Sequence, residues 1–293
     1  IGAIMKSVGI IGVGNMGGGM ARRLLSQGWA VHVRDVDPTV LAPLQALGAV
    51  VHPTPAALAE AVDRLIVCVV DAHQMDDVLL GSQGAANGLR LGQAVLLCPT
   101  ISPEDAESLG QRLSALGAEP IDAPMSGGPV RAEQGTMSLM VACPDSVFEA
   151  HQDLLQALAN PVFRISERVG DGARTKLVNN LLAGINLAGA AEVLALAERM
   201  GLSQATTLNV MERSSGQSWI ASDRMRRAIE GDYAPRAHMT LLEKDTRLAV
   251  QAAQRVGVTP ALGTQASAIF AQASAAGFAK EDDAALLKHL STP

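Results

Sequence analysis

A short β-branched run that ends in closely spaced glycines constrains this chain more than any other feature. Residues 7–11 read Ser-Val-Gly-Ile-Ile, and Gly12, Gly14 and Gly17 follow in the spacing G-x-G-x-x-G, at the opening of a helix-period segment. In this context the first glycine permits a tight turn, the second lets a ligand approach the backbone, and the third lets helix and strand pack closely. The pattern therefore predicts a βαβ unit that binds the pyrophosphate of a dinucleotide at the helix N-terminus.

Short apolar runs alternate with amphipathic stretches through the first half, which is typical of a parallel sheet with helices on both faces. We expect strands at Ser7–Ile11, Ala30–Arg34, Arg64–Val69, Ala94–Leu97, Glu119–Asp122 and Ser138–Cys143, and a helix at Met16–Gln27. From Gly170 onward no run reads as a strand, and we expect helices at Arg174–Met200, Ser203–Ser214, Ser222–Glu230, Met239–Val256, Gly263–Ala276 and Glu281–Leu290.

The predicted fold class is therefore α/β, in two domains. A Rossmann-type, doubly wound, mostly parallel sheet occupies residues 5–168, and an all-α domain with a long interdomain helix occupies residues 169–293. Ile1–Ile4, which precede Met5, are expected to be a remnant outside the fold.

Composition excludes several classes of function. Aromatic residues make up only 2% of the chain and the net charge is −6, which argues against a nucleic-acid partner. No apolar run reaches the length of a membrane span and no signal-peptide pattern precedes the first strand, so no membrane partner is expected. Cys68, Cys98 and Cys143 show no CxxC pairing, which favours buried thiols in a cytoplasmic protein. No cluster has metal-ligand spacing, so we expect no metal.

The residue at the end of the second predicted strand bears on the choice of dinucleotide. A carboxylate at Asp35 can accept hydrogen bonds from both ribose hydroxyls of NAD and would repel the 2′-phosphate of NADP. Val36 and Asp37 supply no cation for that phosphate, although Arg34 precedes Asp35. NAD is therefore the predicted cofactor.

Three further motifs resemble signatures of one family. They are Asp122-Ala-Pro-Met-Ser-Gly-Gly-Pro-Val-Arg-Ala-Glu-Gln-Gly135, Gly170-Asp-Gly-Ala-Arg-Thr-Lys-Leu-Val-Asn-Asn180 and Lys244-Asp-Thr-Arg-Leu-Ala249. Together with the glycine turn, they resemble the β-hydroxyacid dehydrogenases, which include 3-hydroxyisobutyrate dehydrogenase and tartronate semialdehyde reductase and, more distantly, 6-phosphogluconate dehydrogenase. The four motifs occur in order over nearly the whole chain, and the resemblance implies hydride transfer between NAD and a small hydroxy acid.

The resemblance also implies roles for individual residues. Oxidising an alcohol needs a base for the hydroxyl proton, and Lys176 matches the family's residue for this task. An ammonium group serves near neutral pH only where burial or neighbouring charge lowers its pKa. Asn180, one helical turn further on, would bind the same substrate. The turn Ser126, Gly127 and Gly128 would hold the substrate carboxylate.

For the cofactor, the resemblance and the glycine pattern together indicate a larger set. Thr100 matches a loop at the cofactor, and Lys244 matches a position that reaches the nicotinamide end. Asp245 either orients these neighbours or forms an ion pair on the helix surface. The expected cofactor-binding residues are Gly12, Val13, Gly14, Asn15, Met16, Gly17, Asp35, Val70, Thr100, Lys244 and Asp245.

One position departs from the family pattern. Many members carry glycine where this chain has Arg131. Arg131 either adds a cation for a second polar group of the substrate or faces solvent.

Within the family, the stretches around Trp219, Tyr233 and Lys280 are most similar to the L-threonate dehydrogenase branch, which oxidises the 2-hydroxyl of a four-carbon sugar acid. The alternatives are 3-hydroxyisobutyrate dehydrogenase, tartronate semialdehyde reductase and, more distantly, a non-catalytic NAD-binding module. An imine reductase or a non-catalytic module would be expected to lack Lys176. The Ala- and Gly-rich helical half also predicts a homodimer or homotetramer.

Overall fold

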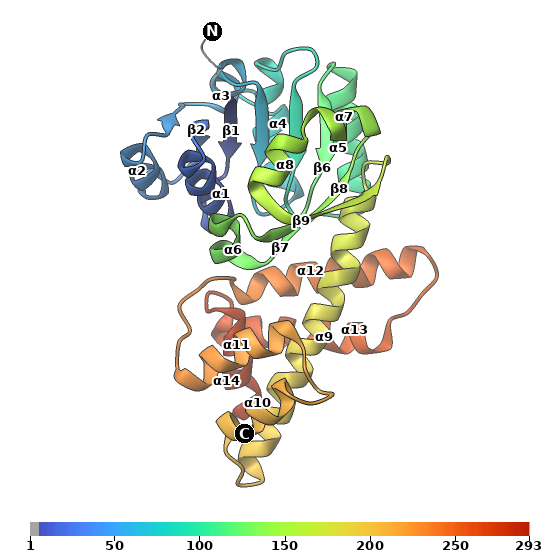
Figure 1. Cartoon of the computed structure of the whole chain (residues 1–293). Coiled ribbons are helices and arrows are strands. Elements are labelled where there is room, and N and C mark those ends of the chain that lie inside the picture. Colours follow the sequence, from blue (N-terminus) through green and yellow to red (C-terminus); the bar gives the residue numbers. More distant parts are fainter. Residues whose placement is uncertain (1–5, 293) are drawn as a thin grey trace. The chain divides into compact units, whose positions relative to one another are not determined.

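The structure, a computed structural model, describes residues 6–292. The chain forms two compact units, residues 1–176 and 177–293 (Figure 1). The expectations for Ile1–Ile4, and for Met5 as the start of the first domain, lie outside the described residues.

The first unit is built on a mostly parallel sheet with the strand order β3-β2-β1-β4-β5-β6-β8-β7, and β9 pairs with β8. The six strands from β3 to β6 are mutually parallel, β8 runs antiparallel to β6 and β7, and β9 is parallel to β8. The strands are β1 (Ser7–Ile11), β2 (Ala30–Arg34), β3 (Val50–Val51), β4 (Arg64–Val67), β5 (Ala94–Leu97), β6 (Glu119–Asp122), β7 (Met125–Ser126), β8 (Met137–Ala142) and β9 (Ala159–Ser166).

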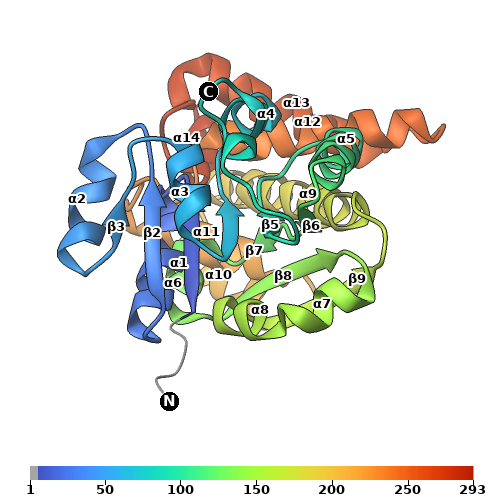
Figure 2. The same ribbon diagram turned by 90° about the horizontal axis from the view of Figure 1, so that it is seen from above.

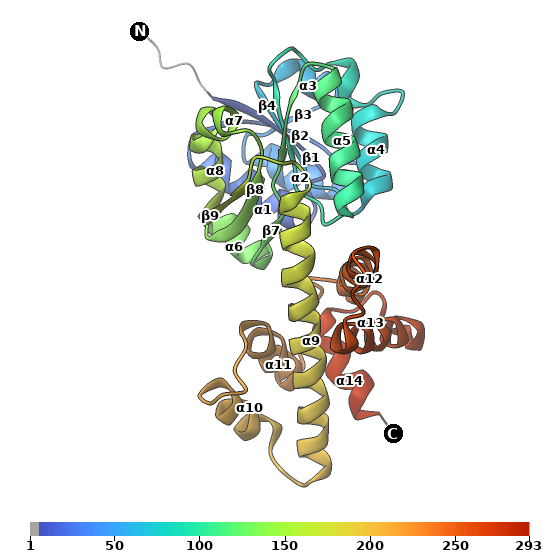
Figure 3. The same ribbon diagram turned by 90° about the vertical axis from the view of Figure 1, so that its right-hand side faces the viewer.

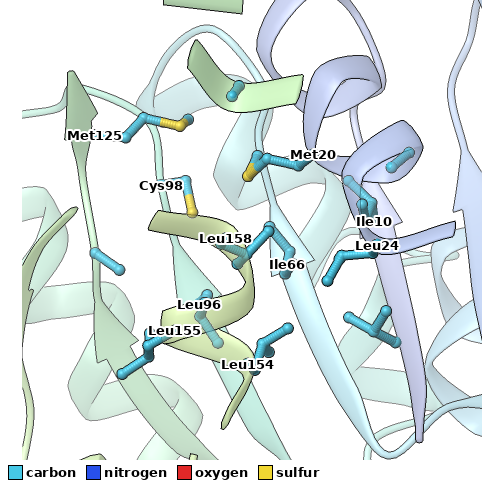
Figure 4. Close-up of a cluster of buried hydrophobic side chains, with 14 of the residues drawn as sticks. Ile10, Met20, Leu24, Ile66, Leu96, Cys98, Met125, Leu154, Leu155 and Leu158 are labelled. Atoms are coloured by element: carbon cyan, nitrogen blue, oxygen red, sulfur yellow. The ribbon is translucent and has the colours of Figure 1, made fainter. Parts of the chain in front are cut away.

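Helices cover both faces of this sheet because its strands are apolar on both sides (Figure 2). Ile10 packs into one core and its neighbour Ile11 into the other. Figure 4 shows the first core, where Met20 and Leu24 of α1 meet the sheet together with three leucines of α8, Leu154, Leu155 and Leu158. The helices of this unit are α1 (Asn15–Ser26), α2 (Pro38–Ala46), α3 (Pro55–Ala61), α4 (Ala72–Leu80), η1 (Ala85–Asn87), α5 (Pro103–Ala115), α6 (Gly128–Gln134), α7 (Asp145–Ala150) and α8 (Gln152–Leu158).

The doubly wound fold is confirmed, but the predicted strands need correction. The strand predicted at Arg64–Val69 ends at Val67, and that predicted at Ser138–Cys143 lies one residue earlier. The short strands β3 and β7 and the edge strand β9 were not predicted. The Asn160-Pro161 pair inside β9 is typical of a turn, yet an edge strand tolerates proline because one side of its backbone needs no partner.

The second unit is helical, and α9 runs as one continuous helix from the first unit into it (Figure 3). Its core joins Leu187 and Leu194 of α9 to Met225, Phe270 and neighbouring side chains. The helices are α9 (Asp171–Arg199), α10 (Gln204–Glu212), α11 (Trp219–Glu230), α12 (Met239–Arg255), α13 (Ala261–Ala273), η2 (Ser274–Phe278), η3 (Asp283–Ala285) and α14 (Leu286–Ser291). The single helix predicted at Glu281–Leu290 is instead η3 followed by α14, because the Asp282 side chain caps the chain at Ala284.

The length and hydropathy of α9 also correct an expectation. One 18-residue window of this helix has a mean hydropathy of 1.5, which would suffice for a membrane span, whereas no such run was expected. Half of that window is buried inside the molecule, as in the core helix of a globular unit.

Candidate active site

The carboxyl ends of the parallel strands bring several predicted site residues to one edge of the sheet. Gly12 follows β1, Asp35 follows β2, and Val70 and Thr100 follow β4 and β5 by three residues each. Because β1 lies between β2 and β4, the order of crossovers reverses at this point. Ligands of doubly wound sheets bind outside the strand ends at such a reversal.

The glycine turn has room for a ligand at one position and for nothing at the other two. A Cβ on Gly12 would lie 2.6 Å from the carbonyl oxygen of Cys68, and one on Gly17 would lie 1.9 Å from that of Gly12. Gly12 also has a φ of +85°, which favours glycine. Nothing lies within 4 Å of a Cβ on Gly14. The turn is therefore tightly packed on the protein side and open at Gly14, which fits the approach of a pyrophosphate to the start of α1.

Asp35 is tied to the glycine turn. Its carboxylate accepts hydrogen bonds from the backbone N–H of Val13 (2.7 Å) and that of Asp37 (3.0 Å). Each carboxylate oxygen keeps a lone pair for a further donor, such as a ribose hydroxyl. Arg34 donates to the carbonyl oxygen of Asp35 itself, and Val36 is 88% exposed. The side chain of Val13 belongs to the core, so only its backbone faces the turn.

The remaining predicted cofactor residues of the first unit have distinct environments. Asn15 begins α1, and Met16 packs against the sheet core. Val70 is half exposed, and its backbone N–H donates to Gln74 Oε1 at 2.9 Å. Thr100 is half-buried in the loop between β5 and α5.

The turn predicted to hold the substrate carboxylate joins β7 to α6. Gly127 has a φ of +128° and Gly128 a φ of +77°, so both need glycine. The hydroxyl of Ser138 on β8 donates to the carbonyl oxygen of Ser126 at 3.3 Å, which fixes the start of the turn.

A residue outside the predicted site, Asp122, fixes the start of α9. It ends β6, and its Oδ2 accepts hydrogen bonds from the backbone N–H groups of Gly170 (2.7 Å) and Ala173 (3.1 Å). A Cβ on Gly172 would lie 2.9 Å from the Asp122 carboxylate, so the first turn of α9 needs glycine there. Burial raises the pKa of Asp122 to about 6, although the hydrogen bonds from Ala173, Gly170 and Gly172 act in the opposite direction.

This cap determines where Lys176 lies. Because β6 is parallel to β5, Asp122 lies at the same carboxyl edge of the sheet as the glycine turn. Lys176 follows in the second turn of α9 and is 7% exposed. A helix-surface lysine would be solvated, so the burial of Lys176 is unusual for its residue type.

In the helical unit, Asn180, Asp245 and Lys244 form a polar cluster, of which Asn180 and Asp245 are buried. Asn180 Nδ2 donates to Asp245 Oδ2 at 2.7 Å, and Lys244 Nζ lies 3.1 Å from Asp245 Oδ1. Asn180 and Asp245 are 8% and 7% exposed. Asp245 therefore links its two neighbours, and its ion pair with Lys244 is not on the helix surface. Asn180 Oδ1 accepts a further hydrogen bond from Asn179.

Comparison with known proteins identifies the family. A family model described as the NAD binding domain of 6-phosphogluconate dehydrogenase matches residues 7–167. A second, described as NAD-binding of NADP-dependent 3-hydroxyisobutyrate dehydrogenase, matches residues 170–290.

Individual relatives cover nearly the whole chain. An L-threonate dehydrogenase of Cupriavidus necator is 36% identical over 97% of this chain and 95% of its own. A crystal structure of 3-hydroxyisobutyrate dehydrogenase from Salmonella typhimurium is 37% identical, covers 97% of this chain and 99% of its own, and has a TM-score of 0.91. The structure of Psf3 in complex with NADP+ and 2-OPP is 30% identical, covers 97% and 100%, and has a TM-score of 0.90.

The matched models and the identity over the full length agree with the strand order and with the glycine turn. The chain belongs to the 3-hydroxyisobutyrate dehydrogenase-like family of β-hydroxyacid dehydrogenases, and it is a nicotinamide-dependent oxidoreductase acting on the CH–OH group of a hydroxy acid.

Proposed function

We propose that this chain oxidises a small 2-hydroxy acid at C2 with NAD, and that L-threonate is its substrate. The observation that carries the mechanism is the burial of Lys176 on a helix whose first turn is capped by Asp122, at the same sheet edge as the glycine turn. The amine and the dinucleotide turn are thereby fixed to one rigid frame, the sheet of the first unit.

The glycine turn and Asp35 would bind the dinucleotide. The N–H groups at the start of α1 face the open side of Gly14, which suits a pyrophosphate, and the Asp35 carboxylate suits the ribose diol of NAD. The bound nicotinamide ring supplies the hydride acceptor. Val70 and Thr100, on neighbouring loops at this edge, and Lys244 with Asp245 are the further residues that we propose for the cofactor.

Lys176 would move the hydroxyl proton. In the oxidation, its neutral amine accepts the proton from the hydroxyl oxygen as the hydride leaves the carbon that bears this hydroxyl. In the reverse reaction its ammonium returns the proton to the carbonyl oxygen. Asn180 lies one turn further along α9, and its amide is held by Asp245. One amide proton remains for the substrate, so Asn180 would orient the hydroxy acid rather than exchange protons with it.

The turn Ser126–Gly128 would bind the substrate carboxylate. Its glycine conformations expose backbone N–H groups beside a hydroxyl, and these donors suit an anion. All candidate hydroxy acids share this carboxylate, so contacts to the rest of the substrate would determine which acid is accepted.

The choice of L-threonate rests on the names of relatives. L-Threonate dehydrogenases of several bacteria are 36% or 37% identical to this chain, whereas the mitochondrial 3-hydroxyisobutyrate dehydrogenase of Rattus norvegicus is 30% identical. The 3-hydroxyisobutyrate dehydrogenase of Salmonella typhimurium is nevertheless 37% identical to this chain. 3-Hydroxyisobutyrate is therefore the second candidate substrate.

The test is a panel of acids assayed by NADH formation: L-threonate, D-erythronate, 3-hydroxyisobutyrate, glycerate and serine, together with tartronate semialdehyde in the direction of reduction. We expect the highest kcat/KM for L-threonate. A higher value for 3-hydroxyisobutyrate, or for tartronate semialdehyde reduction, would replace L-threonate as the proposed substrate. Binding of NADH without turnover of any acid would favour a non-catalytic module.

We also propose that the protein works in the cytoplasm. Cys68, Cys98 and Cys143 are free thiols. Burial raises the pKa of Cys68 to about 12 and that of Cys143 to about 11, and it raises the pKa of Cys98 as well. Unpaired thiols of this kind persist in a reducing compartment.

A further inference from the structure

Arg131 lies directly against the turn proposed to hold the substrate carboxylate. It belongs to α6, and its side chain folds back along the first glycine of the helix entry. A Cβ on Gly127 would meet Arg131 Cδ at 3.0 Å, Cβ at 3.3 Å and Nε at 3.3 Å. The stem of Arg131 therefore packs on Gly127, and Nε, where the guanidinium group begins, lies beside the same glycine.

The guanidinium group of Arg131 has no internal partner. Within residues 6–292, no carboxylate or carbonyl accepts a hydrogen bond from it, although its side chain is half-buried. Its neighbours differ in this respect. Arg22 Nε donates to Glu133 Oε2 at 3.0 Å, and Arg23 Nε donates to the carbonyl oxygen of Ala157 at 3.0 Å. The five N–H donors of Arg131 thus remain available to a ligand.

The backbone that carries Arg131 is firmly held. A Cβ on Gly19 of α1 would come within 3.0 Å of the Pro129 carbonyl oxygen and 3.1 Å of Ala132 Cβ, so α6 packs closely on α1. The helix ends at Gly135 in the left-handed conformation, and the next residue, Thr136, donates its N–H to the Arg131 carbonyl oxygen at 2.9 Å. The backbone of Arg131 is therefore held in place, and it carries a charged side chain with several N–H donors beside the turn.

We propose that Arg131 determines substrate specificity, by donating hydrogen bonds to the hydroxyl groups that follow the reacting carbon of a polyhydroxy acid. This inference rests on the proposed function, because it takes the Ser126–Gly128 turn as the carboxylate site. A hydroxyl group on C3 of the substrate gives the guanidinium group a hydrogen-bond acceptor. A methylene or methyl group at that place displaces the water bound to the guanidinium group and offers no acceptor in its place. Arg131 thus selects sugar acids over alkyl-substituted hydroxy acids.

The test compares two substrates that differ by one hydroxyl: L-threonate and 2,4-dihydroxybutanoate of matched C2 configuration. Arg131→Met keeps the stem that packs on Gly127 and removes the donors. We expect kcat/KM for L-threonate to fall about ten- to a hundredfold, and that for the deoxy acid to change less than about threefold. The loss should appear mainly in KM, because the hydroxyl is bound alike before and during hydride transfer.

Arg22→Met is the matched control. It removes one positive charge and one contact to α6, but the Arg22 side chain pairs with Glu133, whereas Arg131 is the side chain that packs on Gly127. It should leave the ratio between the two substrates unchanged. An equal loss for both acids in Arg131→Met, no loss for either, or a wild-type preference for the deoxy acid would each overturn the role of Arg131. Low wild-type activity on L-threonate, with a clear preference for another polyhydroxy acid over its deoxy form, would instead overturn only the proposed substrate.

Discussion

Lys176 is the residue on which the proposed chemistry depends, and its variants should separate catalysis from binding. Replacing Lys176 by alanine removes the proposed acid/base, and we predict a fall in kcat of about 10²- to 10⁴-fold. Lys176→Arg should recover little, because a guanidinium group hardly deprotonates and its donors point differently. Steady-state kinetics with the preferred hydroxy acid measure both effects.

The binding of NADH should survive these substitutions. Fluorescence titration should give a similar Kd for each variant, because the glycine turn and Asp35 lie on other elements. Lys280→Ala, which removes an exposed lysine of the helical unit, is the control and should keep full activity. Near-normal kcat in Lys176→Ala would contradict the mechanism, whereas a joint loss of NADH binding would indicate misfolding.

Asp35 should determine the choice between NAD and NADP. We predict a higher kcat/KM with NAD, because the carboxylate accepts the ribose diol and repels a 2′-phosphate. Asp35→Ser combined with Val36→Arg should narrow or invert this preference, since residue 36 is exposed and Arg34 already supplies a cation nearby. The measurement is the ratio of kcat/KM values for the two cofactors.

Asp35→Asn separates the effect of the negative charge at residue 35 from that of its hydrogen bond to the glycine turn. Asparagine keeps an oxygen for the Val13 N–H, so the turn should stay intact while the repulsion of a phosphate disappears. The preference for NAD should then weaken without a large loss of total activity. Equal use of NAD and NADP by the unaltered protein would rule out this role of Asp35.

Sequence reasoning found individual residues best where a motif is local. Gly12, Gly14 and Gly17 lie in one turn, and their roles follow from backbone geometry that the spacing itself specifies. The cap by Asp122 was missed because Gly170 and Ala173 are remote in sequence. The contact between Asn180 and Asp245 was likewise outside what spacing can reveal. The available signals for Asp122 were its acidic side chain at the end of a buried strand and its place at the start of a family-like motif.

At the scale of the element, the cap at the start of α9 should make the free energy of unfolding depend on pH. Burial raises the pKa of Asp122 from 3.8 to about 6, so the folded protein holds this proton more tightly than the unfolded chain. The stabilising contribution is then complete below about pH 4 and is lost as the pH rises through about 6. We predict that this residue makes the free energy of unfolding fall over that range, as measured by urea denaturation.

Two substitutions isolate the effect of Asp122. Asp122→Asn keeps an oxygen for the Gly170 and Ala173 N–H groups but cannot ionise, so it should flatten the pH dependence and equal or exceed the wild type near pH 7. Asp122→Ala leaves both N–H groups without their acceptor and should cost about 1 kcal/mol or more at every pH. A wild-type profile that matches that of Asp122→Asn would refute the raised pKa.

Helices and strands could be predicted from the sequence where their apolar residues follow one clear pattern. β1 and β5 are buried along most of their length and read as apolar runs, whereas β2 alternates buried valines with half-buried residues. These two strand patterns are both recognisable, and β1, β2, β5 and β6 have their predicted bounds. β3 and β7 contain two residues each, which is too short for any pattern to emerge. β9 exists because β8 offers it a partner, and this tertiary pairing outweighs the turn signal of Asn160-Pro161.

At the scale of the whole molecule, the helical unit leaves an apolar stripe uncovered. Along α9 and at the residue that follows it, the side chains of Val178, Leu182, Val193, Leu196 and Met200 are between 42% and 73% exposed. Their spacing of three or four residues, with a longer interval that contains the exposed Gly189, puts them along one side of the helix. A row of exposed apolar side chains is uncommon on a monomer and typical of a protein interface.

We therefore predict a homodimer or homotetramer that buries this stripe. Leu196→Lys with Met200→Lys should shift the mass in solution toward the monomer, because a buried charge without a partner opposes association. Light scattering coupled to size-exclusion chromatography at micromolar concentration measures the mass. Leu91→Lys, at an 89% exposed leucine of the first unit, is the control and should leave the assembly intact. A monomeric mass for the unaltered protein would contradict the prediction, and an unchanged oligomer in the double variant would exclude the stripe as its interface.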